Sequence, residues 1–233
     1  MAISYSVIIP AYNEEASVER AVRETAGVFD GLGKAYEIIV VDDGSSDRTA
    51  ASAMAAGVPA VRVLRHETNQ GKGAAVRTGV MNAGGELILF MDCDLATHPS
   101  EATAFIKQMG DCDIAIGSRR HAASVIVVSQ PWYRVAYGRL VNLFIRRTLG
   151  LPYHDTQCGF KMFRAAPARE IFRAIGPSRW TFDAEVLLRA RAAGYRIVEL
   201  PIAWRNGAST RVKSTEVIAD LGRLLKLKKQ LDK

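Results

Sequence analysis

Short apolar runs alternate with stretches of helical spacing along the first half of the chain. The apolar runs predict buried strands at residues 5–10, 36–47, 60–66 and 86–92. Apolar residues spaced by three or four positions predict helices at residues 13–29, 46–56 and 71–84. Strands that alternate with helices are typical of βαβ units, so we expect an α/β fold with a mostly parallel sheet flanked by helices.

The second half of the chain is less regular. Residues 113–120 predict a strand followed by a basic loop, residues 155–164 a loop or strand, and residues 196–205 one strand. Helices are predicted at residues 165–175 and 180–194. Because no internal repeat or low-complexity linker divides the chain, we expect a single domain over residues 1–233.

Two further helices, at residues 132–150 and 214–233, combine an apolar stripe with basic residues. The stripe of the last helix comprises Val217, Leu221, Leu224 and Leu225. The basic residues of the two helices are Arg134, Arg139, Arg146, Arg147, Lys226, Lys228 and Lys229. Such helices either pack on the core or lie on an anionic membrane, at ~1 kcal/mol per basic residue near it. We expect these basic amphipathic helices to make peripheral membrane contact.

The strand predicted at 86–92 ends in Asp92-Cys93-Asp94. Residues i and i+2 of a strand point the same way, and two carboxylates held close repel unless something positive joins them. A divalent cation with oxygen ligands is one candidate, and a loop with two solvated acids is the alternative. In open α/β sheets, ligands bind beyond the carboxyl ends of strands. The segments "PAYNE", "DDGSSD" and "DCD" all fall there, which favours the metal.

Composition and charge narrow the class of protein. Hydrophobic residues make up 48% of the 233 and charged residues 24%, as in folded soluble proteins, and no apolar run approaches the ~18 residues of a spanning helix. The first residues lack a basic leader, so we expect no signal peptide. Three scattered cysteines are too few for a disulfide framework or a zinc site. These features fit a reducing cytoplasm.

Positive charge is concentrated in the second half. Residues 1–116 carry 9 Lys+Arg and 16 Asp+Glu, whereas residues 117–233 carry 22 and 8, which together give the net +7. This asymmetry predicts an anionic partner, namely nucleic acid, an anionic membrane or a phosphorylated substrate. The segment Gly71-Lys72-Gly73 does not complete a nucleotide-binding pattern. A P-loop would need glycine at position 66, which is His66, and a G-x-G-x-x-G pattern would need glycine at position 76, which is Val76.

Eight segments in order carry a resemblance to a known family. They are "VIIPAYNEE", "IIVVDDGSSDRT", "NQGKGAAVRTG", "MDCDL", "GSR", "DTQCGFKMF", "TFDAEVLLRARAAGYRIVELPIAW" and the Ser-Thr-Arg-Val that follows. Together they resemble family 2 glycosyltransferases of the Rossmann-like GT-A fold, and more narrowly the dolichyl- and polyprenyl-phosphate glucosyl- and mannosyltransferases. The resemblance covers nearly the whole chain. It implies a nucleotide-sugar donor, a divalent metal (Mg²⁺ or Mn²⁺), inversion at the anomeric carbon and a lipid-phosphate acceptor.

The resemblance also implies roles for residues of the first half, residues 1–116, which we expect to form the nucleotide-sugar and metal half. The positions that match donor-binding residues are Pro10, Tyr12, Glu14, Asp42, Asp43, Gly71 and Lys72. Asp92 and Asp94 match the catalytic DxD element, which binds the metal. Related synthases often place a polar residue two positions after the second aspartate, where this chain has Ala96. Water or donor oxygens would then complete the metal's ligands.

Residues 117–233 correspond to the acceptor half. Arg119 matches the "GSR" arginine and Arg134 a later arginine, and both are expected to meet phosphate, to which arginine donates in a bidentate manner. Asp155, Gln157 and Lys161 match the "DTQCGFK" loop beside the reaction centre. We expect Arg119 and Asp155 to take part in catalysis, and Arg119, Arg134, Gln157 and Lys161 to bind the acceptor phosphate. The Gln-Cys version of this loop resembles the glucosyl branch.

The sequence therefore predicts a metal-dependent, inverting glycosyltransferase that moves glucose from UDP-glucose to a polyprenyl phosphate. We expect a peripheral enzyme at the cytoplasmic face of a membrane, with a membrane-protein partner as a further possibility. Rival hypotheses are a GDP-mannose-dependent mannosyltransferase and a family 2 enzyme with a saccharide or protein hydroxyl acceptor. A nucleic-acid-binding module is a distant rival, because basic residues are interleaved with apolar stripes and no recognition motif is present.

Overall fold

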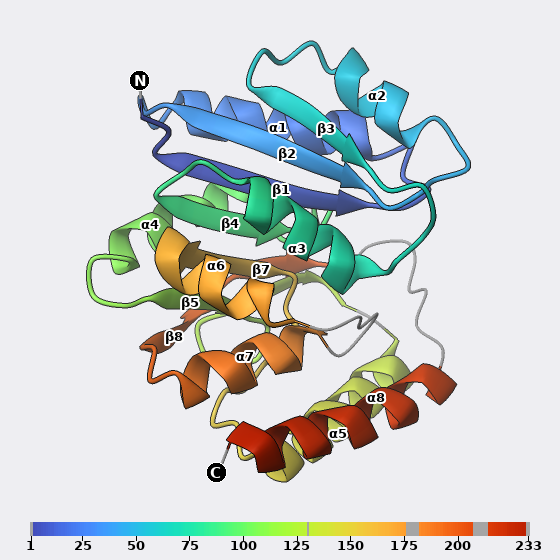
Figure 1. Cartoon of the computed structure of the whole chain (residues 1–233), viewed down its shortest axis with the longest axis vertical. Helices are drawn as coiled ribbons and strands as arrows, with labels where there is room; N and C mark the ends of the chain where they lie inside the picture. The colour runs from blue at the N-terminus through green and yellow to red at the C-terminus, as the bar shows by residue number, and fades with distance from the viewer. Residues whose placement is uncertain (1, 130, 176–181, 207–213, 232–233) are drawn as a thin grey trace.

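A sheet of seven strands forms the centre of the molecule (Figure 1). The structure, a computed structural model, describes residues 2–129, 131–175, 182–206 and 214–231, without the side chains of 134 and 214–221. The strands of this sheet are β1 (Tyr5–Ala11), β2 (Tyr36–Asp42), β3 (Val61–Arg65), β4 (Leu87–Met91), β5 (Ile114–Ser118), β7 (Phe160–Arg164) and β8 (Ile197–Pro201). Their order across the sheet is β3-β2-β1-β4-β7-β5-β8.

All neighbouring strands are parallel except at β7, which runs antiparallel to both β4 and β5. The expected mostly parallel sheet is therefore confirmed, and the segment at 155–164 becomes a strand only from Phe160. Because β7 is reversed, its first residue lies at the edge where the parallel strands end. The register pairs Met91 with Phe160, so the loop before β7 lies beside the residues that follow β4.

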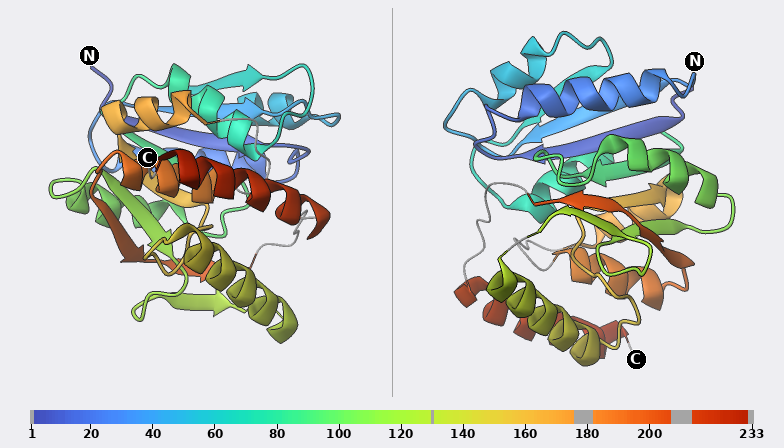
Figure 2. Two further views of the ribbon diagram at one scale, coloured as in Figure 1. Left: turned by 60° about the horizontal axis from the view of Figure 1, so that its bottom comes forward. Right: turned by 180° about the vertical axis from the view of Figure 1, so that it is seen from behind.

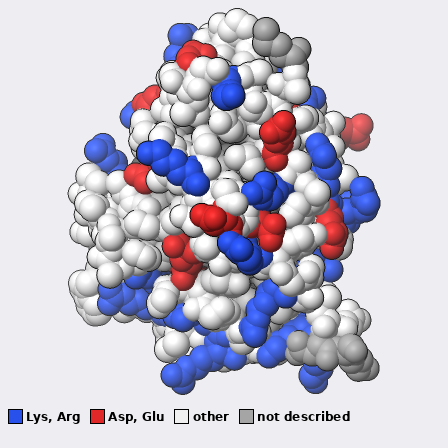
Figure 3. Space-filling view, turned by 90° about the vertical axis from the view of Figure 1, so that its left-hand side faces the viewer, with Lys and Arg blue, Asp and Glu red and all other residues white. Residues whose placement is uncertain are grey.

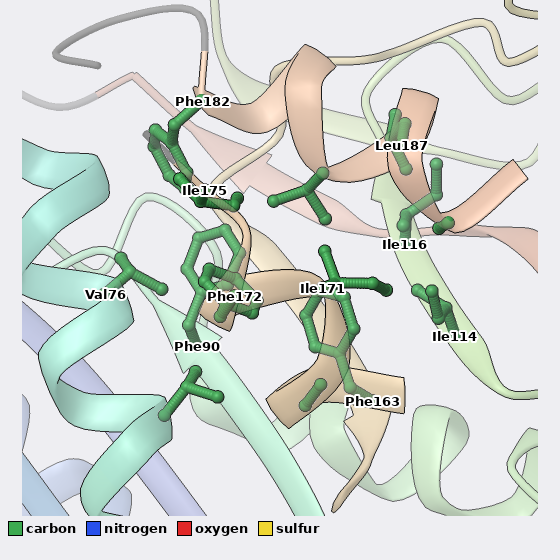
Figure 4. Packing of buried hydrophobic residues seen from close by; sticks show 14 of the residues in the cluster. Val76, Phe90, Ile114, Ile116, Phe163, Ile171, Phe172, Ile175, Phe182 and Leu187 are labelled. Carbon is green, nitrogen blue, oxygen red and sulfur yellow. The ribbon is translucent and has the colours of Figure 1, made fainter. Parts of the chain in front are cut away.

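Alternate residues of each strand feed two cores, one on each face of the sheet. On one face, strand residues such as Phe90 and Phe163 pack with residues of helices such as Val76, Phe172 and Phe182 (Figure 4). The helices of this face are α3 (Lys72–Asn82), α6 (Ala165–Arg173) and α7 (Phe182–Ala192). Each large apolar side chain buried in this way contributes about 1.5–3 kcal/mol.

The opposite face is covered by helices from the first half of the chain. They are α1 (Val18–Asp30), α2 (Thr49–Ala55) and α4 (Ala102–Gln108), the last preceded by the short helix η1 (Pro99–Glu101). Phe29 of α1 and Phe105 of α4 are fully buried against strand residues such as Val7, Leu89 and Phe160. Because helices cover both faces of the sheet, ligands are expected at the carboxyl ends of its parallel strands, as in other folds of this kind.

A second, two-stranded sheet lies outside the main one. It pairs β6 (Val125–Val128) with β9 (Ala203–Arg205) in parallel. The prediction of one strand over 196–205 is wrong, because the chain leaves the main sheet after Pro201. Ile202, which is buried, then accepts a hydrogen bond from Val125 N at 3.1 Å. Strand β6 was not predicted, although its four apolar residues formed a visible run.

The helices α5 (Trp132–Leu149) and α8 (Ser214–Leu231) contact each other at one end of the molecule (Figure 2). Leu224 of α8 is fully buried, whereas Leu225 is exposed, so the predicted stripe is not a single face. Its other two members, Val217 and Leu221, lie outside the described side chains. Arg223 of α8 pairs with the buried Glu185 of α7 at 2.8 Å. In the part of the chain that the structure describes, no helix has the length and apolarity needed to cross a bilayer.

Candidate active site at the carboxyl edge of the sheet

The predicted site residues gather where the parallel strands end and β7 begins. Asp92 and Asp94 follow β4, and the backbone N–H of Asp92 donates to the carbonyl of Gly159, just before β7, at 3.1 Å. The turn continues through Leu95, whose φ of +56° is unusual for a residue other than glycine. Backbone strain of this kind persists only where the surrounding structure requires it, and it clusters at functional sites.

The two carboxylates of the DxD element are in different surroundings. Asp94 Oδ1 accepts a hydrogen bond from Ala96 N at 3.0 Å. Loss of solvent around this carboxylate, and then the negative charge of Asp92, raise the pKa of Asp94. A pKa raised by a neighbouring carboxylate means that the anionic pair is repulsive, so that a bound cation is stabilising there.

Lys72, the first residue of α3, supplies one such cation. Its ammonium group forms an ion pair with Asp92 Oδ1 and lies 5.9 Å and 5.8 Å from the ring centroids of Phe90 and Phe182. Burial disfavours the charge on Lys72, but the carboxylates of Asp92 and Asp183 outweigh burial and raise the pKa of Lys72 above its ordinary value. Lys72 therefore stays charged next to the DxD element, where it can also meet a donor diphosphate.

The two aspartates of the DxD element suit a divalent cation whose remaining coordination is completed by a bound diphosphate. Among the described residues, no group of three or more His, Cys, Asp or Glu side chains could hold a metal ion. Asp92 and Asp94 alone offer carboxylate oxygens, which suit Mg²⁺ and Mn²⁺. Mg²⁺ is commonly bound through one or two carboxylates plus phosphate oxygens and water, so the site fits a cation that arrives with a diphosphate.

Gly159 is required by the position of Asp92. A Cβ atom at residue 159 would lie 2.0 Å from Asp92 Oδ2 and 2.3 Å from its Cγ, distances that force the carboxylate to move. We therefore expect Gly159→Ala to lower turnover about 10²-fold, since a shift of ~1 Å can cost that much. Calorimetry should also show weaker metal-dependent nucleotide binding.

The matched control for this variant is Gly27→Ala in α1, where a Cβ would meet no atom within 4 Å. Gly27→Ala should keep full activity and gain up to ~1 kcal/mol in the free energy of unfolding, because glycine weakens helix interiors. Full activity of Gly159→Ala with an unchanged metal response would contradict the assignment of Asp92.

Arg119 and Asp155 form a buried ion pair on the other side of the site. Asp155 is 1% exposed, and both of its oxygens accept from the guanidinium, at 2.7 Å from Nε and 2.9 Å from Nη2. Burial alone would raise the pKa of Asp155, but Arg119 outweighs burial and lowers that pKa to about 2. The Arg119 guanidinium lies 5.7 Å from the ring centroid of Trp204 in β9. Asp155 thus holds Arg119 in place and is a poor base.

Two residues without a predicted role support this ion pair. Glu199 of β8 accepts from the backbone N–H of Asp155 at 2.9 Å, and Trp204 stacks against the guanidinium of Arg119. Both residues lie in the long motif "TFDAEVLLRARAAGYRIVELPIAW", which could have drawn attention to them. The backbone N–H of Gln157 donates to Asp155 at 3.3 Å, while the buried Nε2 of Gln157 has no hydrogen-bond partner among the described residues.

Lys161 is paired within the protein. It is fully buried in β7, where its ammonium pairs with Asp183 and donates to the carbonyl of Cys158 at 2.5 Å. The Phe90 ring centroid lies 5.2 Å away. In β7 the Lys161 side chain points into the core, and its predicted contact with the acceptor phosphate stays a prediction. The side chain of Arg134, in α5, lies outside the described residues.

Asp43 organises the loop that leads into α3. Its Oδ1 accepts from Gln70 N at 2.9 Å and lies 2.7 Å from His66 Nδ1, and its Oδ2 accepts from Gly71 N at 2.7 Å. Gly71 has a φ of +95°, in the region that favours glycine, which lets the loop turn into the helix. Asp43 is 2% exposed. Its carboxylate therefore positions Gly71 and Lys72, and its predicted contact with the donor remains untested.

The remaining predicted donor residues surround the ends of β1 and β2. Asp42 is fully buried; its Oδ1 accepts from Ser45 N at 2.9 Å, and its Oδ2 lies 3.3 Å from Arg65 Nε without a hydrogen bond. The backbone N–H of Glu14 donates to Thr49 at 2.8 Å. The other two residues are Pro10, partly buried in β1, and Tyr12, which is exposed.

Comparison with other proteins identifies relatives of this chain. The model for glycosyl transferase family 2 matches residues 6–172. A dolichyl-phosphate beta-glucosyltransferase of Drosophila melanogaster is 35% identical over 222 residues, which make up 87% of this chain and 67% of that protein. A dolichyl-phosphate beta-glucosyltransferase of Homo sapiens is 33% identical over 85% of this chain and 66% of that protein.

A further relative, glycosyltransferase AglD of Haloferax volcanii, is 33% identical over 94% of this chain and 36% of its own length. This chain thus spans about two thirds of the two beta-glucosyltransferases and about a third of AglD.

Solved structures share the fold. Glucosyl-3-phosphoglycerate synthase from Mycobacterium tuberculosis, in complex with Mn²⁺, UDP and glucosyl-3-phosphoglycerate, matches with a TM-score of 0.69 and 21% identity. The match covers 97% of this chain and 78% of that one. A second complex of that synthase, with Mg²⁺ and UDP, matches with a TM-score of 0.68. The expected GT-A fold is confirmed.

Proposed function

The chain belongs to glycosyl transferase family 2, and on this premise we propose that it transfers glucose from UDP-glucose to a polyprenyl or dolichyl phosphate, with inversion. In this reaction an oxygen of the lipid phosphate attacks the anomeric carbon, and the bond from that carbon to the β-phosphate of UDP breaks. The products are UDP and a lipid-phosphate glucose. Two dolichyl-phosphate beta-glucosyltransferases, 35% and 33% identical to this chain, support this choice of sugar and acceptor.

The donor belongs beside residues 1–116. Asp92 and Asp94 would hold Mg²⁺ or Mn²⁺, which offsets the charge of the diphosphate leaving group when bound. Lys72 adds a positive charge beside the same carboxylates. Asp42 Oδ2 is buried near Arg65 without a hydrogen bond among the described residues, and it would accept one from the nucleoside. Residues 117–233 would supply the acceptor contacts.

The state of Asp155 is the single observation that carries the choice of a phosphate acceptor. A hydroxyl acceptor has a high pKa and needs a base to take its proton, whereas a phosphate monoester has a second pKa of about 6 and is mostly a dianion at pH 7. Both oxygens of Asp155 are occupied by Arg119, and the pKa of Asp155 is held at about 2. This arrangement suits an acceptor that arrives deprotonated.

Arg119 is the residue that would orient the acceptor. Its ion pair with Asp155 and its contact with Trp204 hold the guanidinium in one orientation. An arginine held in this way can donate to phosphate oxygens and offset their repulsion from the donor diphosphate. The unpaired Nε2 of Gln157 would donate a further hydrogen bond. Because the proposed acceptor is a lipid, the enzyme would work at a membrane surface, for which we propose the cytoplasmic face.

A nucleotide panel tests the donor. Calorimetry with UDP, GDP, CDP and dTDP, each with and without Mn²⁺ or Mg²⁺, should show the tightest binding for UDP, strengthened at least about tenfold by the metal because the cation joins two anionic groups. GDP as the preferred ligand would replace the proposal by the mannosyltransferase. Retention of the protein on DNA that falls with salt, without any nucleotide binding, would instead support a nucleic-acid-binding module.

A further inference from the structure

Exposed apolar side chains are concentrated in one segment of the chain. Among the described residues, fourteen large hydrophobic side chains are exposed, and ten of them lie between residues 125 and 144. We call these ten the β6–α5 surface. They are Val125, Ile126, Val127, Val128, Trp132, Tyr133, Tyr137, Leu140, Leu143 and Phe144. Single exposed apolar residues are normal, but a cluster of this size marks an interaction site.

Strand β6 departs from the usual pattern of a half-buried strand. Its four residues are all 43–58% exposed, although side chains in a strand point alternately to opposite faces. Side chains on both faces of β6 are therefore exposed. Among the described strands, β6 pairs only with β9. Four consecutive apolar side chains exposed to water are unfavourable, so we expect this strand to be covered by a binding partner.

Helix α5 carries two apolar faces. Ile145 and Leu149 are buried, and the buried Asn142 donates to the carbonyl of His154 at 2.8 Å, so this face holds α5 against the protein. The other face is exposed and recurs with helical spacing at Tyr133, Tyr137, Leu140 and Phe144. Trp132, at the start of the helix, is 81% exposed. Helix α8 differs, because its Leu224 is turned into the core.

The charged residues of the segment that carries the β6–α5 surface have one sign. Residues 117–154 contain six arginines and no aspartate or glutamate. Lys and Arg, without Asp or Glu, are seen over the lower part of the face in Figure 3, the end at which α5 and α8 lie in Figure 1. Tryptophan and tyrosine beside arginine are typical of segments at the boundary between lipid and water.

The surface is joined to the site. Arg120, next to Arg119, donates to the carbonyl of Gly138 in α5 at 2.9 Å. Strand β9, the partner of β6, carries Trp204, which contacts Arg119 and bridges to Thr97 in the loop after the DxD element. In the left view of Figure 2, β6 and α5 lie at the lower edge of the molecule, outside the main sheet.

We propose that the β6–α5 surface inserts into the headgroup region of an anionic lipid bilayer and presents Arg119 to phosphate groups at that boundary. The role for Arg119 rests on the proposed function, whereas insertion itself does not. A second copy of the chain fits this surface less well. In a two-fold dimer each patch faces its own equivalent, so the arginines around it would oppose arginines. Anionic headgroups pair with those arginines while the apolar side chains enter the lipid.

Sedimentation with vesicles tests the insertion without donor or acceptor. The full chain is mixed with phosphatidylcholine vesicles that contain or lack phosphatidylglycerol, at low and at physiological salt. We expect binding to the anionic vesicles that weakens as salt rises, because the Debye length falls to about 8 Å at physiological ionic strength. Leu140→Asp and Phe144→Asp should each lower the partition coefficient about tenfold, since a charge would enter the apolar boundary.

Met54→Asp is the matched control, because Met54 is 56% exposed on α2, outside the surface. It adds the same charge to an exposed helix position and should bind vesicles almost as well as the parent protein. Circular dichroism of all three variants shows whether each is folded. Equal binding by Leu140→Asp, Phe144→Asp and the parent would overturn the proposal. So would a dimer in the parent that Leu140→Asp converts to monomer while vesicle binding stays unchanged.

Glucose transfer to a short-chain, detergent-soluble polyprenyl phosphate separates this inference from the proposed function. If the parent transfers glucose in detergent but the surface variants bind vesicles normally, insertion is wrong and the function stands. If the surface variants lose vesicle binding but the parent transfers no glucose, the surface stands and the function is wrong. The surface variants should keep detergent activity within about twofold of the parent, because the substituted residues lie outside the site.

Discussion

Replacing either aspartate of the DxD element by asparagine is expected to lower turnover by at least about 10²–10³-fold while the protein stays folded. The carboxylates of Asp92 and Asp94 repel each other, and a bound cation would relieve that repulsion. Asp92→Asn and Asp94→Asn each remove one of the two negative charges that would bind the cation. A metal that binds more weakly would stabilise the charge of the leaving diphosphate less. The loss of one such electrostatic interaction lowers turnover by about 10²–10³-fold in other enzymes. Asp94 is exposed, so Asp94→Asn should leave the free energy of unfolding nearly unchanged, whereas Asp92→Asn also loses the ion pair with Lys72 and should lower it by up to about 1 kcal/mol.

Two measurements check this prediction. Steady-state kinetics give the loss of turnover, and calorimetry with UDP should lose its response to Mn²⁺ in both variants. Asp111→Asn is the matched control, because Asp111 is exposed and lies just before β5, at the edge of the sheet opposite the DxD element. Retention of the metal response in both DxD variants would refute the assignment of these residues.

Asp155→Asn is expected to reduce activity by about 10–100-fold but not to abolish it. The substitution keeps the shape of the side chain and removes the charge that holds Arg119, so Arg119 loses its fixed orientation. The KM for the lipid phosphate should rise more than the KM for UDP-glucose. A variant as inactive as Asp92→Asn, with donor binding intact, would indicate a general base and hence a hydroxyl acceptor.

The same variant has a pH signature in stability. The pKa of Asp155 is about 2 in the folded protein and about 3.9 in an unfolded chain, so its ionisation favours the folded state by about 2–3 kcal/mol at neutral pH. Because the folded pKa is depressed, this contribution is fully present above about pH 4–5 and is lost as pH falls through about 2. In urea unfolding, the difference between the parent and Asp155→Asn should shrink over that range. A difference that does not change with pH would contradict the ion pair.

Much of the main sheet could be predicted because strands such as β1, β2 and β4 are nearly continuous apolar runs bounded by turns. Strands such as β4 are buried on both faces, and the aspartates after them mark where they end. The direction of β7 could not be predicted, since pairing with β4 and β5 is decided by contacts distant in the sequence. That direction brings Gly159 against Asp92, a contact that no local pattern reveals.

Site residues were predicted by position, while their partners were set by the fold. Lys161 was expected to bind phosphate because it is a cation in a motif that resembles the family's loop beside the reaction centre, whereas in β7 its side chain is buried and pairs with Asp183. Asp43 looked like a donor contact, and its oxygens are used by the loop before α3. The link between Arg119 and Trp204 joins residues 85 positions apart in the sequence, beyond the reach of any periodicity.

Transfer of labelled glucose tests the central proposal most directly. The full chain is incubated with radiolabelled UDP-glucose, a divalent metal and a polyprenyl phosphate, with the corresponding polyprenol as the control acceptor, and the lipids are then extracted. We predict label in the lipid phase only with the phosphorylated acceptor, together with an equal amount of UDP. Label on the polyprenol, or transfer from GDP-mannose but not from UDP-glucose, would contradict the proposal.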